Sequence, residues 1–338
     1  MEQRNHAIDN LRGVLTICVV LGHVIFALKD VYDLSTDFIG IVFGVLSSFI
    51  YCFHMPAFFA CSGYFFHRTC DKRLKENLIN KFITLFVPYI LFSCAYWGIK
   101  YLMSSFVNSQ MKLSDLLLIG IKPIEFMWYI YILFWINIVA LLLNRLCKNK
   151  MVLFLLFVLS AILINRIYVP YPFDYLFRNM VYFYLGCILY EKRDKWYKYS
   201  SYTVLALTVS VILFVVHLVR DSGVLTYSST DNLLKLVLAL CFIFCLVSLF
   251  ENFLSRKICF LTGLGENAMP IYMVHVIFGG GSRIILMRLG VDSLLVHTLV
   301  GTGVALLVPY LGYTLVIRKI PFIDFIFYPK RYVKKMND

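Results

Sequence analysis

Two ionisable side chains, Arg12 and His23, lie in the first long apolar stretch of the chain. A helix turns about 100° per residue, so eleven positions bring the second side chain to within roughly 20° of the face of the first. The rise between them is about 16 Å. Imidazole can take a proton from a hydroxyl near neutral pH, and guanidinium suits phosphates. The pair could join a phosphate-bearing donor to proton-transfer chemistry, although Arg12 as a helix anchor and His23 as a hydrogen-bonding residue stay open.

A third candidate is His54, which lies two residues before Pro56 in the second apolar stretch. Proline removes one backbone hydrogen bond and crowds the preceding turn, so we expect a kink or a break near His54. Broken helices at membrane depth line cavities. His54 could therefore share a cavity with His23, and structural hydrogen bonding is the alternative.

The elements that must position these side chains are membrane-spanning helices. The 338 residues are 61% hydrophobic and only 15% charged, whereas soluble domains are roughly one-quarter charged. Because about 20 apolar residues cross the hydrocarbon, the pattern predicts an all-α, polytopic bundle of about ten transmembrane helices. The expected spans are Leu11–Leu28, Phe38–Phe66, Phe82–Met103, Phe126–Leu143, Met151–Ile167, Phe177–Tyr190, Tyr202–Leu218, Leu233–Phe250, Ala268–Met287 and Leu294–Ile317.

Lysine and arginine are unevenly distributed between alternate connections. Cytoplasmic connections retain positive charge, so we expect both termini to be cytoplasmic. The basic set comprises Arg4, Arg12, the tracts HRTCDKRLKENLINK, RLCKNK and EKRDKWYK, Arg256, Lys257 and the tail RKIPFIDFIFYPKRYVKK.

The composition also excludes several classes of function. The net charge of +13 lies in these short tracts, which indicates topology and not a nucleic-acid partner. Most of the ten cysteines lie in apolar runs without paired metal spacing, so we expect neither a disulfide nor a metal site.

The amino terminus shows no recognisable cleavable signal peptide. Without repeats, linkers or long polar stretches, residues 1–338 are expected to form a single transmembrane domain with no separate soluble domain.

Six short motifs, in order along the chain, resemble those of the acyltransferase-3 family. The first is IDNLRGVLTICVVLGHV, in which Asp9, Arg12 and His23 match an Asp-x-x-Arg start that leads to a histidine. The second is FHMPAFFACSGYFF, in which the matching residues are Met55, Pro56, Phe58, Phe59, Ser62, Gly63 and Tyr64. The others are KFITLFVPY, FMWYIYILFW, VYFYLGCILYE and LGENAMPIYMVHVIF.

This resemblance implies an O-acyltransferase of the stand-alone branch that modifies fucose or other surface glycans in a bacterial inner membrane. It implies transfer of an acetyl group from cytoplasmic acetyl-CoA, a donor substrate and not a bound cofactor, to a glycan or lipid-linked sugar. His23 becomes the catalytic base, and Arg12 holds or polarises the donor. Other substrate-binding candidates are Asp9, His54, Ser62, Glu125, Trp128, Asn267 and His275. Candidates for binding acyl-CoA are Arg68, Lys72, Arg73, Lys75 and Lys81, which positive-inside topology alone could also explain.

Several alternatives remain at this point. Better-known branches of the family carry a Ser-x-x-Glu-Glu pattern near Glu125 that this sequence lacks, which leaves any second acid or base undefined. The acyl group could be succinyl, with an exopolysaccharide as acceptor. A polysaccharide exporter or flippase would also have many spans, although no hydropathy repeat between the two halves supports it. The unrelated histidine-and-asparagine acyltransferases place their histidine late in a span and do not fit. Sequence does not indicate an oligomeric state.

Overall fold

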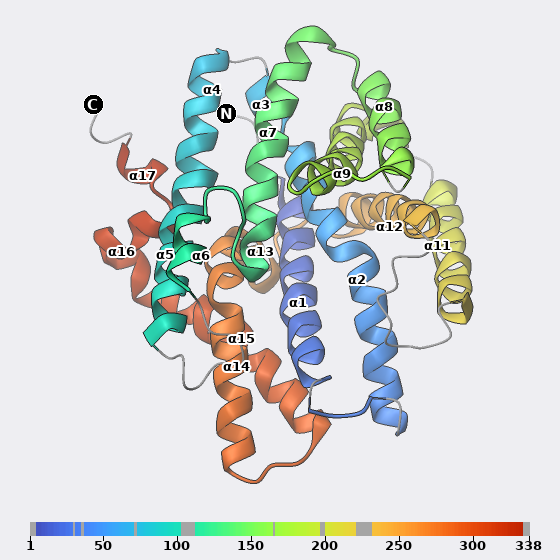
Figure 1. Cartoon of the computed structure of the whole chain (residues 1–338). Coiled ribbons are helices and arrows are strands. Elements are labelled where there is room, and N and C mark those ends of the chain that lie inside the picture. Colours follow the sequence, from blue (N-terminus) through green and yellow to red (C-terminus); the bar gives the residue numbers. More distant parts are fainter. Residues whose placement is uncertain are drawn as a thin grey trace. The chain divides into compact units, whose positions relative to one another are not determined.

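Every regular element in the described part of the chain is a helix (Figure 1). The predicted all-α class is therefore confirmed. The computed structural model describes residues 5–29, 31–34, 37–70, 73–102, 112–164, 166–196, 200–220 and 232–333.

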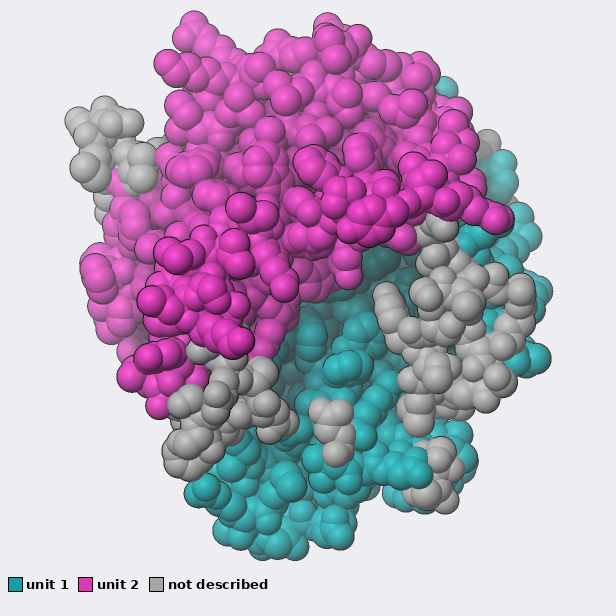
Figure 2. All heavy atoms as spheres, in the orientation of Figure 1, with its two compact units in different colours: residues 1–64, 185–314 teal, residues 65–184, 315–338 magenta. Residues whose placement is uncertain are grey.

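The chain divides into two compact units, which Figure 2 colours separately. Unit 1 comprises residues 1–64 and 185–314, and unit 2 comprises residues 65–184 and 315–338. The single transmembrane domain expected from the sequence stays a prediction.

Unit 1 is built around its first helix, α1, which packs against α2, α12, α13 and α14. Its helices are α1 (His6–Leu28), α2 (Phe38–Tyr64), α10 (Arg193–Trp196), α11 (Ser200–Arg220), α12 (Asn232–Phe253), α13 (Cys259–Glu266), α14 (Ala268–Arg288) and most of α15 (Leu294–Leu315).

Unit 2 contains a long helical run in which α4, a π-helical segment η1 and α5 follow one another directly. Pro88 lies just after η1, and since proline has no N–H and crowds the turn before it, a locally wider helix accommodates the ring. The elements of unit 2 are α3 (His67–Cys70), α4 (Leu74–Lys81), η1 (Phe82–Phe86), α5 (Val87–Leu102), α6 (Leu113–Leu117), η3 (Glu125–Met127), α7 (Trp128–Leu146), α8 (Lys150–Leu163), most of α9 (Phe173–Glu191), η4 (Ile317–Lys319), α16 (Pro321–Phe327) and α17 (Lys330–Val333).

Eight helices within the described ranges are long and apolar enough to cross a membrane. Two predicted spans, Met151–Ile167 and Phe177–Tyr190, are not among them: α8 has only 14 residues, and α9 carries Asp174 and Arg178. The structure thus shows a multi-span membrane protein, and the count of ten spans stays a prediction.

The α2 helix runs unbroken from Phe38 to Tyr64 with Pro56 inside it, so the break expected near His54 does not form. A proline in a membrane helix costs one backbone hydrogen bond, which neighbouring groups can replace locally without ending the helix. His54 therefore lies on a continuous helix.

Apolar side chains point outward from both units. Leu205, Val211 and Ile212 of α11 and Leu155 and Leu159 of α8 are each more than half exposed. Such stripes are unfavourable in water and are expected where helices face lipid.

Candidate active site

The first helix begins earlier than its apolar residues indicate. Asn5 caps α1, and its side-chain oxygen accepts from the backbone N–H of Ile8 at 3.1 Å. The Asn5 Nδ2 donates to the Glu251 carboxylate at 2.7 Å, and the Tyr64 hydroxyl donates to the same oxygen at 2.6 Å. This capping network ties the start of α1 to α12 and α2, so the polar first turn is helical as well.

A buried amide fixes α1 against α13 and the segment before it. The Asn10 side chain is fully buried, and its Nδ2 donates to the backbone oxygens of Leu254 at 2.9 Å and Arg256 at 2.8 Å. Its Oδ1 accepts from the Thr262 hydroxyl at 2.7 Å. The sequence interpretation did not single out Asn10, although an amide flanking an apolar span was an available signal.

Two glycines allow α1 and α13 to approach closely. A Cβ atom at Gly265 would lie 1.9 Å from the backbone oxygen of Asp9, and one at Gly13 would lie 2.1 Å from that of Leu261. Only glycine fits at either position without moving backbone. The helix that carries Arg12 and His23 is therefore held by backbone contact.

Three of the predicted site histidines meet in unit 1. The rings of His23 on α1 and His275 on α14 have centroids 5.1 Å apart at 61°. Tyr51 on α2 lies 6.4 Å from His23 and 5.0 Å from His54, so it bridges the two imidazoles. We call His23, His54, His275 and Tyr51 the histidine cluster. It unites residues from three helices that are far apart in sequence.

Backbone carbonyls set the tautomers of two of these imidazoles. Nδ1 of His54 lies 2.7 Å from the Ile50 oxygen, and Nδ1 of His275 lies 2.6 Å from the Tyr272 oxygen. A carbonyl oxygen only accepts, so Nδ1 donates in both, and Nε2 of each neutral ring carries the lone pair. His54 and His275 are 2% and 1% exposed, whereas His23 is half-buried. His23 is thus the most accessible imidazole of the cluster.

Arg12 lies on the same helix as His23 but nearer its start. Its Nη1 is 3.6 Å from the Asp9 carboxylate, and its side chain is 31% exposed while that of Asp9 is 7% exposed. On a regular helix the two Cα atoms of Arg12 and His23 are about 16 Å apart along the axis. The guanidinium is therefore oriented by a buried carboxylate and remains accessible.

Ser62 and Asn267, two further predicted site residues, also belong to unit 1. Ser62 is half-buried on α2. Asn267 forms the junction of α13 and α14, where its Nδ2 donates to the Gly263 oxygen at 2.8 Å. Asn267 thus bonds to the last turn of α13, directly before the helix that carries His275.

Glu125 and Trp128 belong to unit 2, at the start of α7. Glu125 has a φ of 43°, a left-handed conformation that non-glycine residues rarely adopt. Its carboxylate accepts from the Tyr96 hydroxyl at 2.7 Å and pairs with Lys100. The Trp128 ring contacts that of Tyr175 at 5.3 Å. The sequence interpretation did not identify Tyr96 and Lys100 as partners, because they come from α5.

The basic segment predicted to bind acyl-CoA also lies in unit 2, and Lys72 falls outside the described residues. The Arg68 guanidinium lies 4.5 Å from the centre of the Phe65 ring. Arg73 is 88% exposed beside Glu76, at 3.7 Å. Lys75 is exposed and Lys81, the last residue of α4, is half-buried. The described residues contain no cluster of three or more metal-binding side chains.

Comparison with known proteins agrees with these observations. A family model described as an acyltransferase domain matches residues 5–314 and so includes the histidine cluster and Arg12. No curated protein and no solved structure gives a significant match. With a match over most of its length, this multi-span membrane protein belongs to the acyltransferase-3 family and is a membrane acyltransferase.

Proposed function

We propose that this enzyme moves an acetyl group from cytoplasmic acetyl-CoA to a hydroxyl of a surface polysaccharide, or of its lipid-linked precursor, in a bacterial inner membrane. The observation that carries the proposal is the histidine cluster, in which His23 of α1 contacts His275 of α14. Ionisable residues inside membrane helices are rare and usually functional. A histidine can accelerate acyl transfer to oxygen by taking the proton of the acceptor hydroxyl.

In the proposed reaction, the acceptor hydroxyl oxygen attacks the carbonyl carbon of the thioester while a ring nitrogen of His23 takes the hydroxyl proton. The new C–O bond forms and the C–S bond breaks. The leaving thiolate takes the proton from His23, which gives the ester and free CoA. His275 and Tyr51 position the His23 ring through their contacts at 5.1 and 6.4 Å.

The spacing along α1 separates the roles of its two ionisable residues. The Cα atoms of Arg12 and His23 are about 16 Å apart along the axis of a regular helix, which favours contact of the two side chains with different parts of the donor. Arg12 therefore binds a phosphate of the donor, and the flexible pantetheine arm carries the thioester toward His23. Asp9 keeps the guanidinium oriented at 3.6 Å.

We also propose that the basic segment of unit 2 binds acyl-CoA. Its cations are Arg68, Lys72, Arg73, Lys75 and Lys81. The support is their charge and the exposure of Arg68, Arg73 and Lys75. Nucleotide phosphates are bound by such side chains through charge-assisted hydrogen bonds.

The histidine assignment is tested by His23→Ala and His23→Gln in membranes supplied with acetyl-CoA labelled in the acetyl group. We expect transfer to envelope glycan to fall by about 100-fold or more, as for loss of a general base. Arg12 and the donor site are untouched, so KM for acetyl-CoA should change little. Transfer at the wild-type rate by both variants would overturn the assignment.

His217→Gln is the matched control, since His217 is a buried histidine of α11 outside the histidine cluster. We expect it to transfer at the wild-type rate. Thermal unfolding in detergent confirms that each variant is folded before rates are compared.

The acyl group and the acceptor are identified by mass spectrometry of surface glycans from cells with and without the gene. An acetyl mass difference on a glycan supports the proposal. A mass difference of one succinyl group would identify succinyl as the group that is transferred. The assignment of His23 would be unaffected.

A further inference from the structure

Four aromatic rings of unit 2 form a connected group at the starts of α7 and α9. Trp128 contacts Tyr175 at 5.3 Å, Tyr175 contacts Tyr171 at 5.6 Å, and Tyr171 lies parallel to Tyr131 at 6.4 Å. We call Trp128, Tyr131, Tyr171 and Tyr175 the aromatic shelf. Tyr175 is 41% exposed, whereas Tyr131 is 3% exposed and forms its base. The shelf thus presents the exposed ring of Tyr175 on a group whose base is buried.

Two polar atoms at the shelf are buried and lack a hydrogen-bond partner among the described residues. They are the Tyr171 hydroxyl and Oδ1 of Asp174, in the first turn of α9. A buried polar group without a partner costs about 1–3 kcal/mol. Such a group is often one to which water or a ligand binds.

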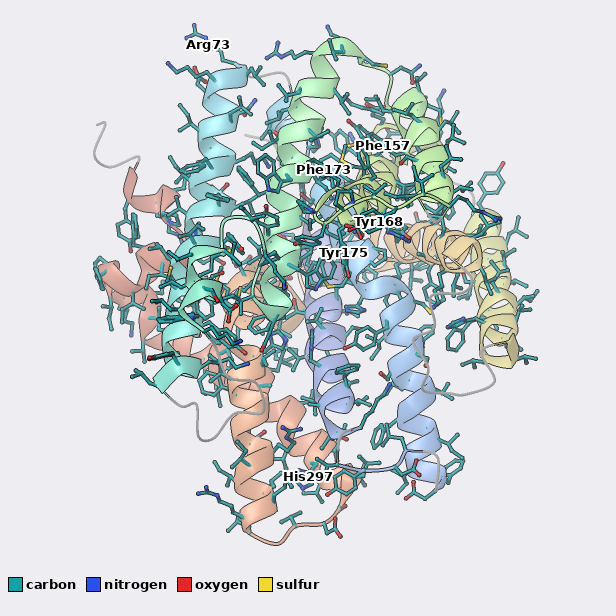
Figure 3. The ribbon with its side chains drawn as sticks, viewed as in Figure 1. Arg73, Phe157, Tyr168, Phe173, Tyr175 and His297 are labelled. Carbon is teal, nitrogen blue, oxygen red and sulfur yellow. The ribbon has the colours of Figure 1, made fainter. Side chains whose placement is uncertain are left out.

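The shelf lies at the end of the α7–α8 pair that is remote from the basic connection. Arg145, Lys148 and Lys150 lie where α7 ends and α8 begins. The 19 residues of α7 span about 28 Å, and Trp128 is at the opposite end. Positive-inside topology then places the shelf on the non-cytoplasmic side. Tyr175 and two exposed aromatic residues near it in the sequence, Tyr168 and Phe173, are labelled in Figure 3.

We propose that the aromatic shelf binds a pyranose ring of the acceptor glycan on the non-cytoplasmic side of the membrane. The identification of the bound sugar as the acceptor rests on the proposed function. The binding of a sugar ring at the shelf does not depend on it. A sugar ring has apolar C–H faces that pack on aromatic surface, and binding sites typically combine such surface with a few polar groups.

The two unpartnered groups distinguish a sugar from other ligands. Burial raises the pKa of the Tyr171 phenol, and the nearby tyrosines and Asp174 raise it further, so the hydroxyl keeps its proton and donates. A carboxylate accepts. Sugar hydroxyls both accept and donate, so they satisfy both groups. A quaternary ammonium group, which also favours aromatic rings, has no lone pair to accept from the phenol.

An aromatic belt at the membrane interface is the simpler explanation of the rings. In a belt the polar ends of the rings reach water or headgroups. The Tyr171 hydroxyl is instead buried. A belt therefore accounts for exposed rings such as Tyr168 but not for the two buried polar atoms.

The test uses the full-length protein in nanodiscs with polysaccharide extracted from the cell envelope, in the absence of acyl-CoA. Binding is measured by saturation-transfer NMR and by titration. We expect Tyr171→Phe, Asp174→Asn and Tyr175→Ala each to weaken binding by about 10-fold or more, as for loss of a hydrogen bond or ring contact to ligand. Tyr168→Ala, an exposed aromatic of the same connection, should bind as the wild type does.

Tyr171→Phe separates binding from structure, because it removes only an unpartnered hydroxyl. Its unfolding temperature should therefore equal or exceed that of the wild type. If Tyr171→Phe, Asp174→Asn and Tyr175→Ala all bound the polysaccharide as the wild type does, the inference would be overturned. It would also be overturned if choline displaced the polysaccharide and free sugars did not bind.

The two proposals fail in different ways. If shelf variants lose polysaccharide binding but no acyl transfer occurs with any glycan, the proposed function is wrong and the shelf is still a glycan site. If transfer occurs with unchanged KM for the glycan in the shelf variants, the shelf inference is wrong and the proposed function stands. In the supporting outcome, KM for glycan rises while KM for acetyl-CoA is unchanged.

Discussion

At the scale of single residues, the proposed chemistry depends on the distance between Arg12 and the histidine cluster. His54 and His275 have their tautomers set by backbone carbonyls, and His23 contacts His275 directly. Arg12 lies about three helical turns away and pairs with Asp9. In the proposed reaction, Arg12 and His23 therefore contact different parts of a long donor molecule.

Arg12→Lys tests this separation of roles. Lysine keeps the charge but loses the planar fork that bonds a phosphate with two N–H groups. We expect KM for acetyl-CoA to rise by about 10-fold, which corresponds to about 1.4 kcal/mol, with a smaller change in kcat. Steady-state kinetics in nanodiscs measure both constants.

The matched control is Arg288→Lys, an exposed arginine in the last turn of α14, which should leave both constants unchanged. If Arg12→Lys also left both constants unchanged, Arg12 would be an anchor of the helix end and would not bind the donor.

At the scale of the element, α1 is placed by its contact with α13. Gly13 and Gly265 bring the two backbones together, and Asn10 bonds to the connection that precedes α13. The amino-terminal half of the helix that carries Arg12 and His23 thus depends on a helix of eight residues that hydropathy did not reveal, because it is too short to cross a membrane.

Gly265→Ala is expected to force α1 and α13 apart, since the new Cβ would lie 1.9 Å from the Asp9 backbone oxygen. Overpacking of this kind costs about 1–3 kcal/mol. Thermal unfolding in detergent should show a lower transition temperature, and acyl transfer should fall because Asp9 and Arg12 move. Gly280→Ala on α14 has open space around it and should be neutral. Equal unfolding temperatures for the two variants would contradict the packing argument.

Helix boundaries show where local sequence is informative. The predicted span Phe38–Phe66 agrees closely with α2, and Ala268–Met287 agrees with α14. The break at Pro56 does not form, because tertiary neighbours can hold a helix together across a missing hydrogen bond. Hydropathy also placed the start of the third span at Phe82, whereas the helical run begins at Leu74, since charged residues with high helix propensity can extend a helix beyond the apolar core.

At the scale of the whole molecule, the distribution of charge predicts a cytoplasmic location for both termini. A fluorescent protein fused after Asp338 should fluoresce, and alkaline phosphatase at the same place should be inactive, because each reporter folds on only one side of the membrane. A fusion after Val291, between α14 and α15, should give the reverse result. An active phosphatase at the carboxy terminus would refute this topology.

Hydropathy and short motifs are local properties of the sequence, so they predicted the all-helical membrane class, most of the long helices and the family. The sequence also predicted that Arg12 and His23 share a helix. The contacts of His275 and of Tyr51 with His23, and the packing of Gly265 on the backbone oxygen of Asp9, depend instead on the tertiary structure. These contacts join residues up to 256 positions apart, as between Asp9 and Gly265, and no spacing rule along one helix can foresee which faces of different helices will pack together.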